Sequence, residues 1–158
     1  MTGDYFAYGL LAALAIALLV TIVTDIRDRK IYNKIVLPIA LGAPLWWIAT
    51  GEPPWPDMVV HLIAAAFVFL LFSLFFYMRV MGGGDVKLFT ALALWFDWVT
   101  TTRMLLYATL IGVAVTGIFW FEHRQRRRPG KVRVPYGVAI AIAGLIICGE
   151  RYFNHFAR

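Results

Sequence analysis

Long apolar runs alternate with short polar segments along the whole chain. A helix of about 20 apolar residues spans a lipid bilayer, so this pattern predicts a set of membrane-spanning helices. The six candidate spans cover residues 5–24, 35–50, 58–78, 86–98, 104–121 and 135–148. Because the segments between them are too short for a separate soluble domain, we expect residues 1–158 to form one integral-membrane domain. The predicted fold is all-α, a polytopic membrane helix bundle with about six transmembrane helices.

The composition agrees with a lipid environment. Hydrophobic residues make up 61% of the chain, charged residues only 15%, and the mean hydropathy is +0.75. These values lie well outside the usual balance of a soluble domain. No Lys or Arg precedes the first apolar run, whereas a secretory signal peptide begins with a basic region. We therefore interpret the first run as a retained helix.

The basic residues are distributed unequally between the polar segments. Twelve of the 15 Lys and Arg residues lie in segments 25–34, 79–87 and 122–134. Loops rich in Lys and Arg stay in the cytoplasm, so both chain ends are expected to lie outside. The net charge of +6 therefore reflects topology and does not indicate nucleic-acid binding. The basic run at 124–128 is best interpreted as a topology anchor, with anionic lipid as its alternative partner.

Several other residues indicate packing more than chemistry. Small residues four apart on the last predicted helix, such as Gly144 and Cys148, favour close helix approach. The six Trp residues lie near span ends, as aromatic side chains at a membrane interface do. His61 has no second or third metal ligand at a recognisable spacing, so we interpret it as an ordinary polar interface residue. Cys148 is the only cysteine, which excludes an intrachain disulfide.

Two aspartates carry the candidate chemistry. Asp25 follows the first apolar run, and Asp85 follows three glycines, Gly82, Gly83 and Gly84. A carboxylate at or inside a bilayer is energetically expensive, which makes each aspartate a functional candidate. The predicted topology places both on the cytoplasmic side. Two carboxyl groups on one side of the membrane favour shared acid–base chemistry.

The triple glycine has a physical consequence of its own. Three successive glycines do not continue a stable helix, and they let the backbone pass close to another group. Asp85 is therefore expected to stand at the start of the fourth helix. Residues 86–98 reach only about 20 Å as a helix, whereas the hydrocarbon core is about 30 Å thick. We expect the turn to lie below the membrane surface, inside protein or beside a water-filled cavity.

Each aspartate also has a simple structural explanation. Asp85 could cap the fourth helix, and Asp25 could be a loop charge paired with Arg27 or Arg29. The triple glycine and the shared membrane face together favour a functional site over these explanations. A proton- or cation-coupled transporter stays open as a second class, because intramembrane carboxylates and broken helices also form ion paths.

The segments around the two aspartates resemble a known family. The stretch Gly82-Gly-Gly-Asp-Val-Lys87 matches the G-x-G-D-x-K signature of type IV prepilin and archaeal preflagellin peptidases. Asp25-Ile-Arg27, followed by Ile31 and Asn33, matches their first motif, D-x-R-x-x-x-I-x-N. Val134-Pro-Tyr-Gly-Val-Ala139 is similar to the region that opens their last helix. The three matches occur in the family's order, from the first predicted helix to the sixth.

The resemblance implies an intramembrane aspartyl endopeptidase with Asp25 and Asp85 as its catalytic pair and with no metal or cofactor. The supporting residues that the motifs supply are Gly82, Gly83, Gly84, Lys87, Arg27 and Asn33. The implied substrate is a type IV (Flp-like) prepilin or a preflagellin-like precursor, with a basic leader and a hydrophobic helix. Cleavage would occur at the cytoplasmic face of the prokaryotic inner membrane. A non-catalytic membrane scaffold for pilus assembly is the third class, and the oligomeric state is not specified.

The chain departs from the family in two places. Tyr32 stands where many members have proline, which alters the turn but removes no catalytic group. The long bifunctional members carry paired C-x-x-C zinc motifs associated with N-methylation, and this sequence contains no C-x-x-C. We therefore expect a form similar to the short, methylase-less peptidases of Tad/Flp-type pilus systems or of archaea.

Overall fold

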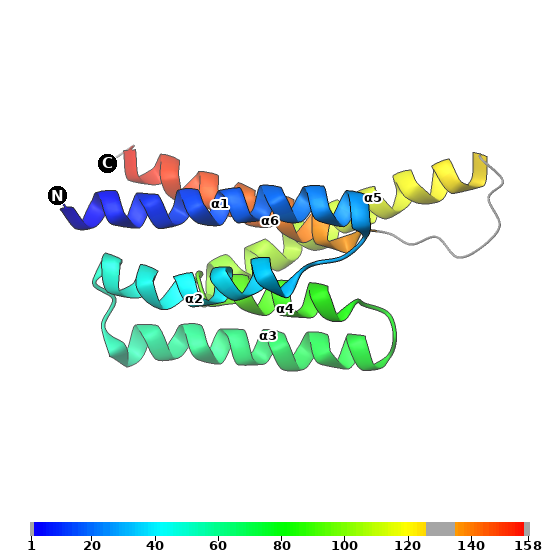
Figure 1. Ribbon diagram of the computed structural model, residues 1–158. Coiled ribbons are helices and arrows are strands. Elements are labelled where there is room, and N and C mark those ends of the chain that lie inside the picture. The colour runs from blue at the N-terminus through cyan, green and yellow to red at the C-terminus, as the bar shows by residue number, and fades with distance from the viewer. Residues whose placement is uncertain (1, 126–134, 157–158) are drawn as a thin grey trace.

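The computed structural model describes residues 2–125 and 135–156 as a bundle of helices (Figure 1). The six α-helices and one short π-helical turn are α1 (Thr2–Asp28), α2 (Asn33–Thr50), η1 (Pro54–Met58), α3 (Val59–Tyr77), α4 (Gly83–Ala93), α5 (Trp98–Gln125) and α6 (Tyr136–Phe156). The described residues contain no strand. The predicted all-α membrane bundle is therefore confirmed.

Four of these helices are long and apolar enough to cross a membrane. The spans are Tyr5–Asp28, Pro54–Tyr77, Trp98–Phe121 and Tyr136–Phe153. The other two candidates are shorter: α2 has 18 residues with prolines at 38 and 44, and α4 has 11. At about 1.5 Å per residue, α4 is only about 16 Å long and cannot cross a hydrocarbon core of about 30 Å. The prediction of a short fourth segment was correct, and the segment is shorter than predicted.

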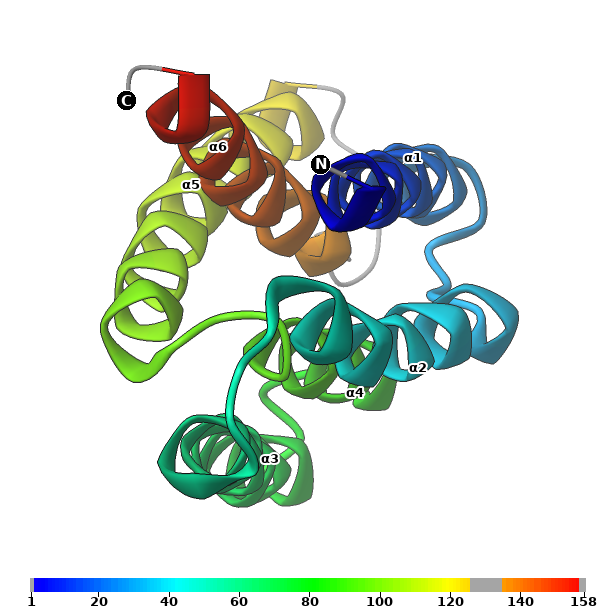
Figure 2. The ribbon, with the colours of Figure 1, turned by 90° about the vertical axis from the view of Figure 1, so that its left-hand side faces the viewer.

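The short helix α4 lies at the centre of the bundle. It packs against α2, α3 and α6, while α1 packs against α2 and α6, and α5 packs mainly against α6 (Figure 2). Most of α4 is buried, including Leu88 and Leu92, which have no exposed surface. In contrast, α3 buries only a stripe at helical spacing, His61, Ala64, Ala65 and Val68. A short helix enclosed in this way positions its first turn, which carries Asp85, inside the protein.

Glycines allow two of the closest contacts in the core. A Cβ atom on Gly42 would lie 2.6 Å from the indole ring of Trp95, and one on Gly144 would lie 2.9 Å from Leu18. The close approach predicted for the last helix is therefore confirmed at Gly144. Of the six Trp residues near the ends of predicted spans, Trp46, Trp47 and Trp95 are buried within the protein. Their rings fill the space between α2 and the end of α4, which sequence position alone does not reveal.

Three other predictions need correction. The first helix continues to Asp28, so Asp25 lies inside α1 and not in a loop. The fourth helix ends at Ala93, and Trp98 begins α5 instead of closing the fourth span. His61 is a buried core residue and not an ordinary interface residue. Tertiary packing thus extends α1 and buries His61, whereas α4 ends earlier than its apolar pattern predicted.

The connections of the bundle separate into two ends. The α1–α2 and α3–α4 connections lie at one end of the bundle, and both ends of the described chain lie at the other (Figure 1). The first end carries the basic segments around Arg29 and Arg79, two residues that adopt positive φ angles of 52° and 58°. The basic run at 124–128 lies mostly outside the described residues.

Candidate active site

Asp25 is a buried carboxyl held by the start of α6. It lies in the last turn of α1, and only 5% of its surface is exposed. The backbone N–H of Val138 donates a hydrogen bond of 3.1 Å to Oδ2 of Asp25. A Cβ atom on Gly137 would lie 2.7 Å from the same oxygen. Because only glycine leaves room for this contact, the first turn of α6 can present its N–H groups to the carboxyl.

Asp85 is a second buried carboxyl, at the start of α4. It is the third residue of the helix, and its Oδ2 accepts a 3.2 Å hydrogen bond from the backbone N–H of Gly82. This bond is the acidic half of a capping box. Asp85 therefore does cap the fourth helix, as the simple structural explanation predicted. Asp85 is nevertheless 9% exposed, whereas most helix caps lie in water. The glycines differ from expectation, since Gly83 and Gly84 belong to the first turn of α4.

The two carboxyls line the same cavity. Its volume is about 450 Å³, and its walls come from the α1–α2 connection and the first turn of α4. Asp85 lies outside the four spanning helices. Burial raises the pKa of its carboxyl from 3.8 to about 7, and the nearby Asp25 carboxylate shifts this pKa in the same direction. One member of the pair is thus able to hold a proton near neutral pH while the other ionises.

Residues 12–117, which include both aspartates, match the Type IV leader peptidase family. The chain belongs to the type IV leader peptidase family. It is 30% identical over 147 residues to the "Prepilin leader peptidase/N-methyltransferase" of Legionella pneumophila, covering 87% of this chain and 48% of that relative. The protein of the same name from Dickeya chrysanthemi is 26% identical over 151 residues, 93% of this chain and 51% of the relative.

The chain therefore spans about half the length of these two type IV leader peptidase relatives. No solved structure matches it significantly. The matched segment begins in α1 and ends in α5, so it contains the first two of the three motifs that carried the resemblance.

The motif residues of this leader peptidase family member separate into two groups. The three glycines and Asn33 line the cavity together with the two aspartates. Lys87 lies beside it, and its Nζ donates a 3.2 Å hydrogen bond to Oδ1 of Asn33, which joins α4 to α2. Arg27 is not among the residues that line the cavity. Its exposed guanidinium lies 3.8 Å from Asp28.

The structure adds residues to the site that the sequence analysis did not propose as functional. Ile31 lies between the two helix starts, because a Cβ atom on Gly84 would be 3.0 Å from its Cβ and one on Gly137 would be 2.7 Å from its Cδ1. The backbone of Val138 was missed as a donor, although the motif at 134–139 marked the region. Arg29 and Lys30 add positive charge to the cavity wall.

Among residues 2–125 and 135–156, no three His, Cys, Asp or Glu side chains are grouped as ligands for a metal ion.

Proposed function

We propose that the chain is an intramembrane aspartyl endopeptidase that removes the basic leader of type IV, Flp-like pilin precursors or preflagellin-like precursors. The observation that carries the proposal is the pair of buried carboxyls, Asp25 and Asp85, in one cavity. Family membership supports a prepilin-type substrate, and the relatives named above are described as prepilin leader peptidases. The activity would need no metal or cofactor.

The carboxyl pair supplies both proton transfers of peptide hydrolysis. Asp85 holds a proton near neutrality and donates it to the oxygen of the scissile carbonyl. Asp25, in its ionised form, accepts a proton from the attacking water and then returns it to the departing amine. Since each Oδ2 already accepts a backbone N–H, each Oδ1 is the oxygen available for these transfers. The pair titrates as a unit, so the division of roles is part of the proposal.

The substrate's apolar helix has a suitable place to lie. A mainly apolar groove of about 480 Å³ runs between α3, α5 and the start of α6, and its walls include Phe72, Phe89, Gly112 and Tyr136. Tyr136 directly precedes Gly137, which contacts Asp25. A helix in this groove would bring the bond at its end close to the carboxyls. Binding in lipid would depend on close van der Waals packing.

The proposed location is the prokaryotic inner membrane, with the active site on the cytoplasmic side and both chain ends outside. The basic segments around Arg29 and Arg79 support this location, because they lie at the same end of the bundle as the cavity (Figure 1). Positively charged loops remain cytoplasmic. The negative inner leaflet would also attract the basic leader of the substrate.

Substitution of each aspartate tests the proposal. Asp25→Asn and Asp85→Asn should each reduce cleavage of a co-expressed prepilin by about a thousandfold, because acid–base catalysis contributes about that much. Asp28→Asn is the matched control, since Asp28 lies one turn further along α1, contacts Tyr32 and Arg27, and is not among the residues that line the cavity. Full processing by either active-site variant, with normal membrane insertion, would refute the peptidase mechanism.

The two other classes give different results in the same strains. A cation-coupled transporter would lose ion flux in reconstituted vesicles without any effect on prepilin length. A pilus-assembly scaffold would retain its role in both variants. The position of both carboxyls at one end of the bundle, away from its middle, favours the peptidase over the transporter.

A further inference from the structure

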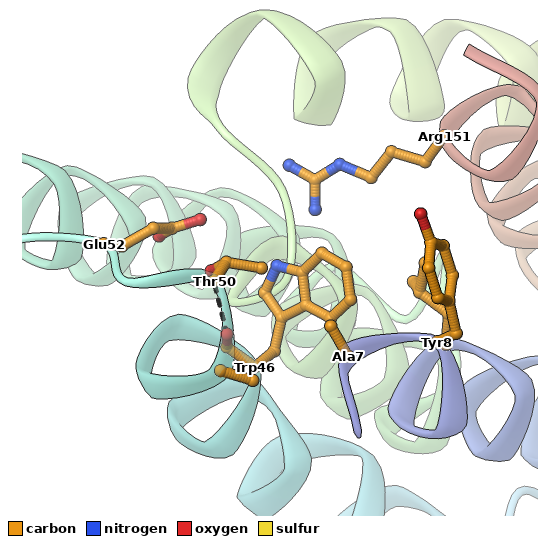
Figure 3. A pocket seen from close by; sticks show the side chains of 8 residues that line it. Ala7, Tyr8, Trp46, Thr50, Glu52 and Arg151 are labelled. Carbon is orange, nitrogen blue, oxygen red and sulfur yellow. Dashed lines mark hydrogen bonds between the residues drawn. The ribbon is translucent and has the colours of Figure 1, made fainter. Parts of the chain in front are cut away.

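A second polar pocket lies at the opposite end of the bundle, where the described chain begins and ends. Its volume is about 400 Å³, and it lies between the start of α1, the end of α2 and the end of α6. In Figure 3 the guanidinium of Arg151 lies above the indole of Trp46, with Glu52 and Tyr8 on either side. None of these residues contributes to the proposed peptidase cavity.

The indole N–H of Trp46 is an unsatisfied donor in this pocket. Trp46 is only 7% exposed, and its Nε1 meets no acceptor among the described residues. The two neighbouring buried indoles differ: Trp47 donates to the carbonyl of Leu94 at 2.9 Å, and Trp95 donates to that of Ile39 at 2.7 Å. A buried donor without a partner is energetically costly, so the exception indicates an acceptor that comes from outside the chain.

Arg151 is a half-buried cation that lacks an ion pair. Its Nη1 donates to the carbonyl of Trp95 at 3.1 Å, and its guanidinium stacks over the rings of Trp46 and Phe96 at 5.3 and 5.7 Å. Among the side chains that the structure describes, no carboxylate lies within 4.0 Å of it. A guanidinium has five N–H donors, so most of its hydrogen-bonding capacity remains for a ligand.

The carboxylate on the pocket wall lies beside a buried histidine. Oε2 of Glu52 lies 2.9 Å from Nε2 of His61, whose Nδ1 lies 2.8 Å from the carbonyl oxygen of Phe96. The His61 ring also stacks on Trp47 with 5.6 Å between centroids. Oε2 of Glu52 is also a buried oxygen without a hydrogen-bond partner among the described residues, and Glu52 and Asp97 are the acidic groups that interact electrostatically with Arg151. The donors that remain for an anion with oxygen acceptors are therefore the Arg151 guanidinium and the Trp46 indole N–H.

The depth of the pocket indicates where such an anion would come from. Tyr8 and Arg151 lie near the ends of two membrane-spanning helices, Tyr5–Asp28 and Tyr136–Phe153. Exposed aromatic residues surround this end, including Tyr5 and Trp55, both more than 75% exposed. Aromatic side chains of this kind occupy the headgroup layer of a bilayer. Every phospholipid carries a phosphate ester in its headgroup, so a phosphate is the anion available at this depth.

We propose that this pocket binds the phosphate of a phospholipid headgroup, with the Arg151 guanidinium and the Trp46 indole N–H as hydrogen-bond donors. The planar guanidinium matches two phosphate oxygens at once, and the indole N–H reaches a third acceptor. The lipid would fix the ends of α1, α2 and α6 relative to one another. The site is separate from the proposed peptidase cavity, so its test does not rely on cleavage.

Lipid titration of the full chain tests this proposal. Delipidated protein in detergent is titrated with short-chain phosphatidylglycerol, with diacylglycerol of the same chain length and with inorganic phosphate, and bound species are counted by native mass spectrometry. We expect one phospholipid to bind tightly and diacylglycerol to bind at least tenfold more weakly. Trp46→Phe, which removes the N–H and keeps an aromatic ring, should weaken binding about fivefold, and Arg151→Gln about tenfold or more.

Two variants serve as matched controls. Trp47→Phe removes an indole N–H that already has a partner, and Arg103→Gln removes a cation paired with Glu150 at 2.7 Å outside the pocket. Both should bind phospholipid within about twofold of the unmodified chain. If Arg151→Gln does not fold, the phospholipid affinity of Trp46→Phe still tests the proposal. Equal binding of diacylglycerol, or unchanged affinity in Trp46→Phe, would overturn the proposal, and equally tight binding of inorganic phosphate would overturn the lipid assignment.

Discussion

The backbone N–H of Val138 donates a hydrogen bond to the carboxyl of Asp25, a residue 113 positions earlier in the chain. The bond joins the first turn of α6 to the last turns of α1, and it fixes one oxygen of the carboxyl within a buried site. Because Oδ2 is held by this bond, the position of Oδ1 of Asp25 is also fixed relative to α1 and α6. This contact joins the Asp25 motif to the 134–139 stretch, which lie near opposite ends of the chain.

Gly137→Ala should reduce activity about a hundredfold while leaving the protein folded. The added methyl would lie 2.7 Å from Oδ2 of Asp25 and 2.7 Å from Ile31, so the carboxyl or the helix must move. Displacements of about 1 Å at a catalytic group cost about a hundredfold in rate. Prepilin cleavage by the purified variant measures the loss.

Gly149→Ala, on the same helix, is the control, because a Cβ atom at Gly149 would meet nothing within 4 Å. A Gly137→Ala enzyme with normal activity would show that the carboxyl does not depend on this close contact.

Substitutions at Asn33 and Arg27 should separate the two groups of motif residues. Asn33→Ala removes the acceptor of Lys87 and loosens the connection between α2 and α4, so we expect activity to fall about three- to tenfold. Arg27→Ala removes an exposed side chain that contacts Asp28, so activity should change by less than about twofold. The measurement is kcat/KM on a leader peptide substrate. The reverse order of effects would indicate that Arg27 acts on the substrate.

Cleavage rate should have a bell-shaped dependence on pH. Burial, with Asp25 nearby, raises the pKa of Asp85 to about 7, so the proton donor is lost as the pH rises above about 7 and the rate falls. At low pH the base becomes protonated and the rate falls again. A rate that keeps increasing up to pH 9 would contradict a carboxylic acid as the donor.

Folding must be monitored in the same experiment, because the raised pKa of Asp85 also affects stability. Between pH 3.8 and about 7 the folded protein retains a proton that the unfolded chain has released. The free energy of unfolding therefore decreases as the pH rises through this range. Asp85→Asn should remove this part of the pH dependence, which thermal unfolding in detergent would detect.

Reporter fusions should place the two ends of the bundle on opposite sides of the membrane. A reporter after Lys131 should be cytoplasmic, whereas reporters after Glu52 and after residue 158 should be external. The reason is the concentration of twelve of the 15 Lys and Arg residues in three segments. A cytoplasmic reporter after Glu52 would show that α1 and α2 do not cross the membrane as a pair.

Gly42→Ala should destabilise the fold, although alanine normally stabilises a helix relative to glycine. The methyl would lie 2.6 Å from the ring of Trp95, and that ring is held by its hydrogen bond to Ile39. Overpacking of this kind costs about 1–3 kcal/mol. Thermal unfolding of Gly42→Ala should be compared with Gly9→Ala, where the added Cβ meets nothing within 4 Å. Equal stability of the two variants would show that Trp95 can move.

The sequence predicted the helices and the aspartates better than it predicted their surroundings. Apolar runs and the triple glycine define where helices start and stop, and the cost of carboxylates in lipid identifies Asp25 and Asp85. The Val138 donor could not be predicted, because any residue supplies a backbone N–H. The burial of His61 and Trp46 was also missed, since near a helix end a polar or amphipathic side chain has the same pattern whether it faces lipid headgroups or another helix.

The length of the helices at the active-site end has a consequence for the bilayer around the protein. The 11-residue helix α4 is enclosed by its neighbours, so thinning of the bilayer would come from the next shortest helix, α2, which has 18 residues and begins at the cavity wall. Thinning there would bring water closer to the cavity of Asp85. A substrate anchored by its own apolar helix would need only lateral diffusion in two dimensions to arrive and, once shortened, to leave. Turnover should therefore depend on acyl-chain length, fastest in bilayers whose thickness matches the thinned region.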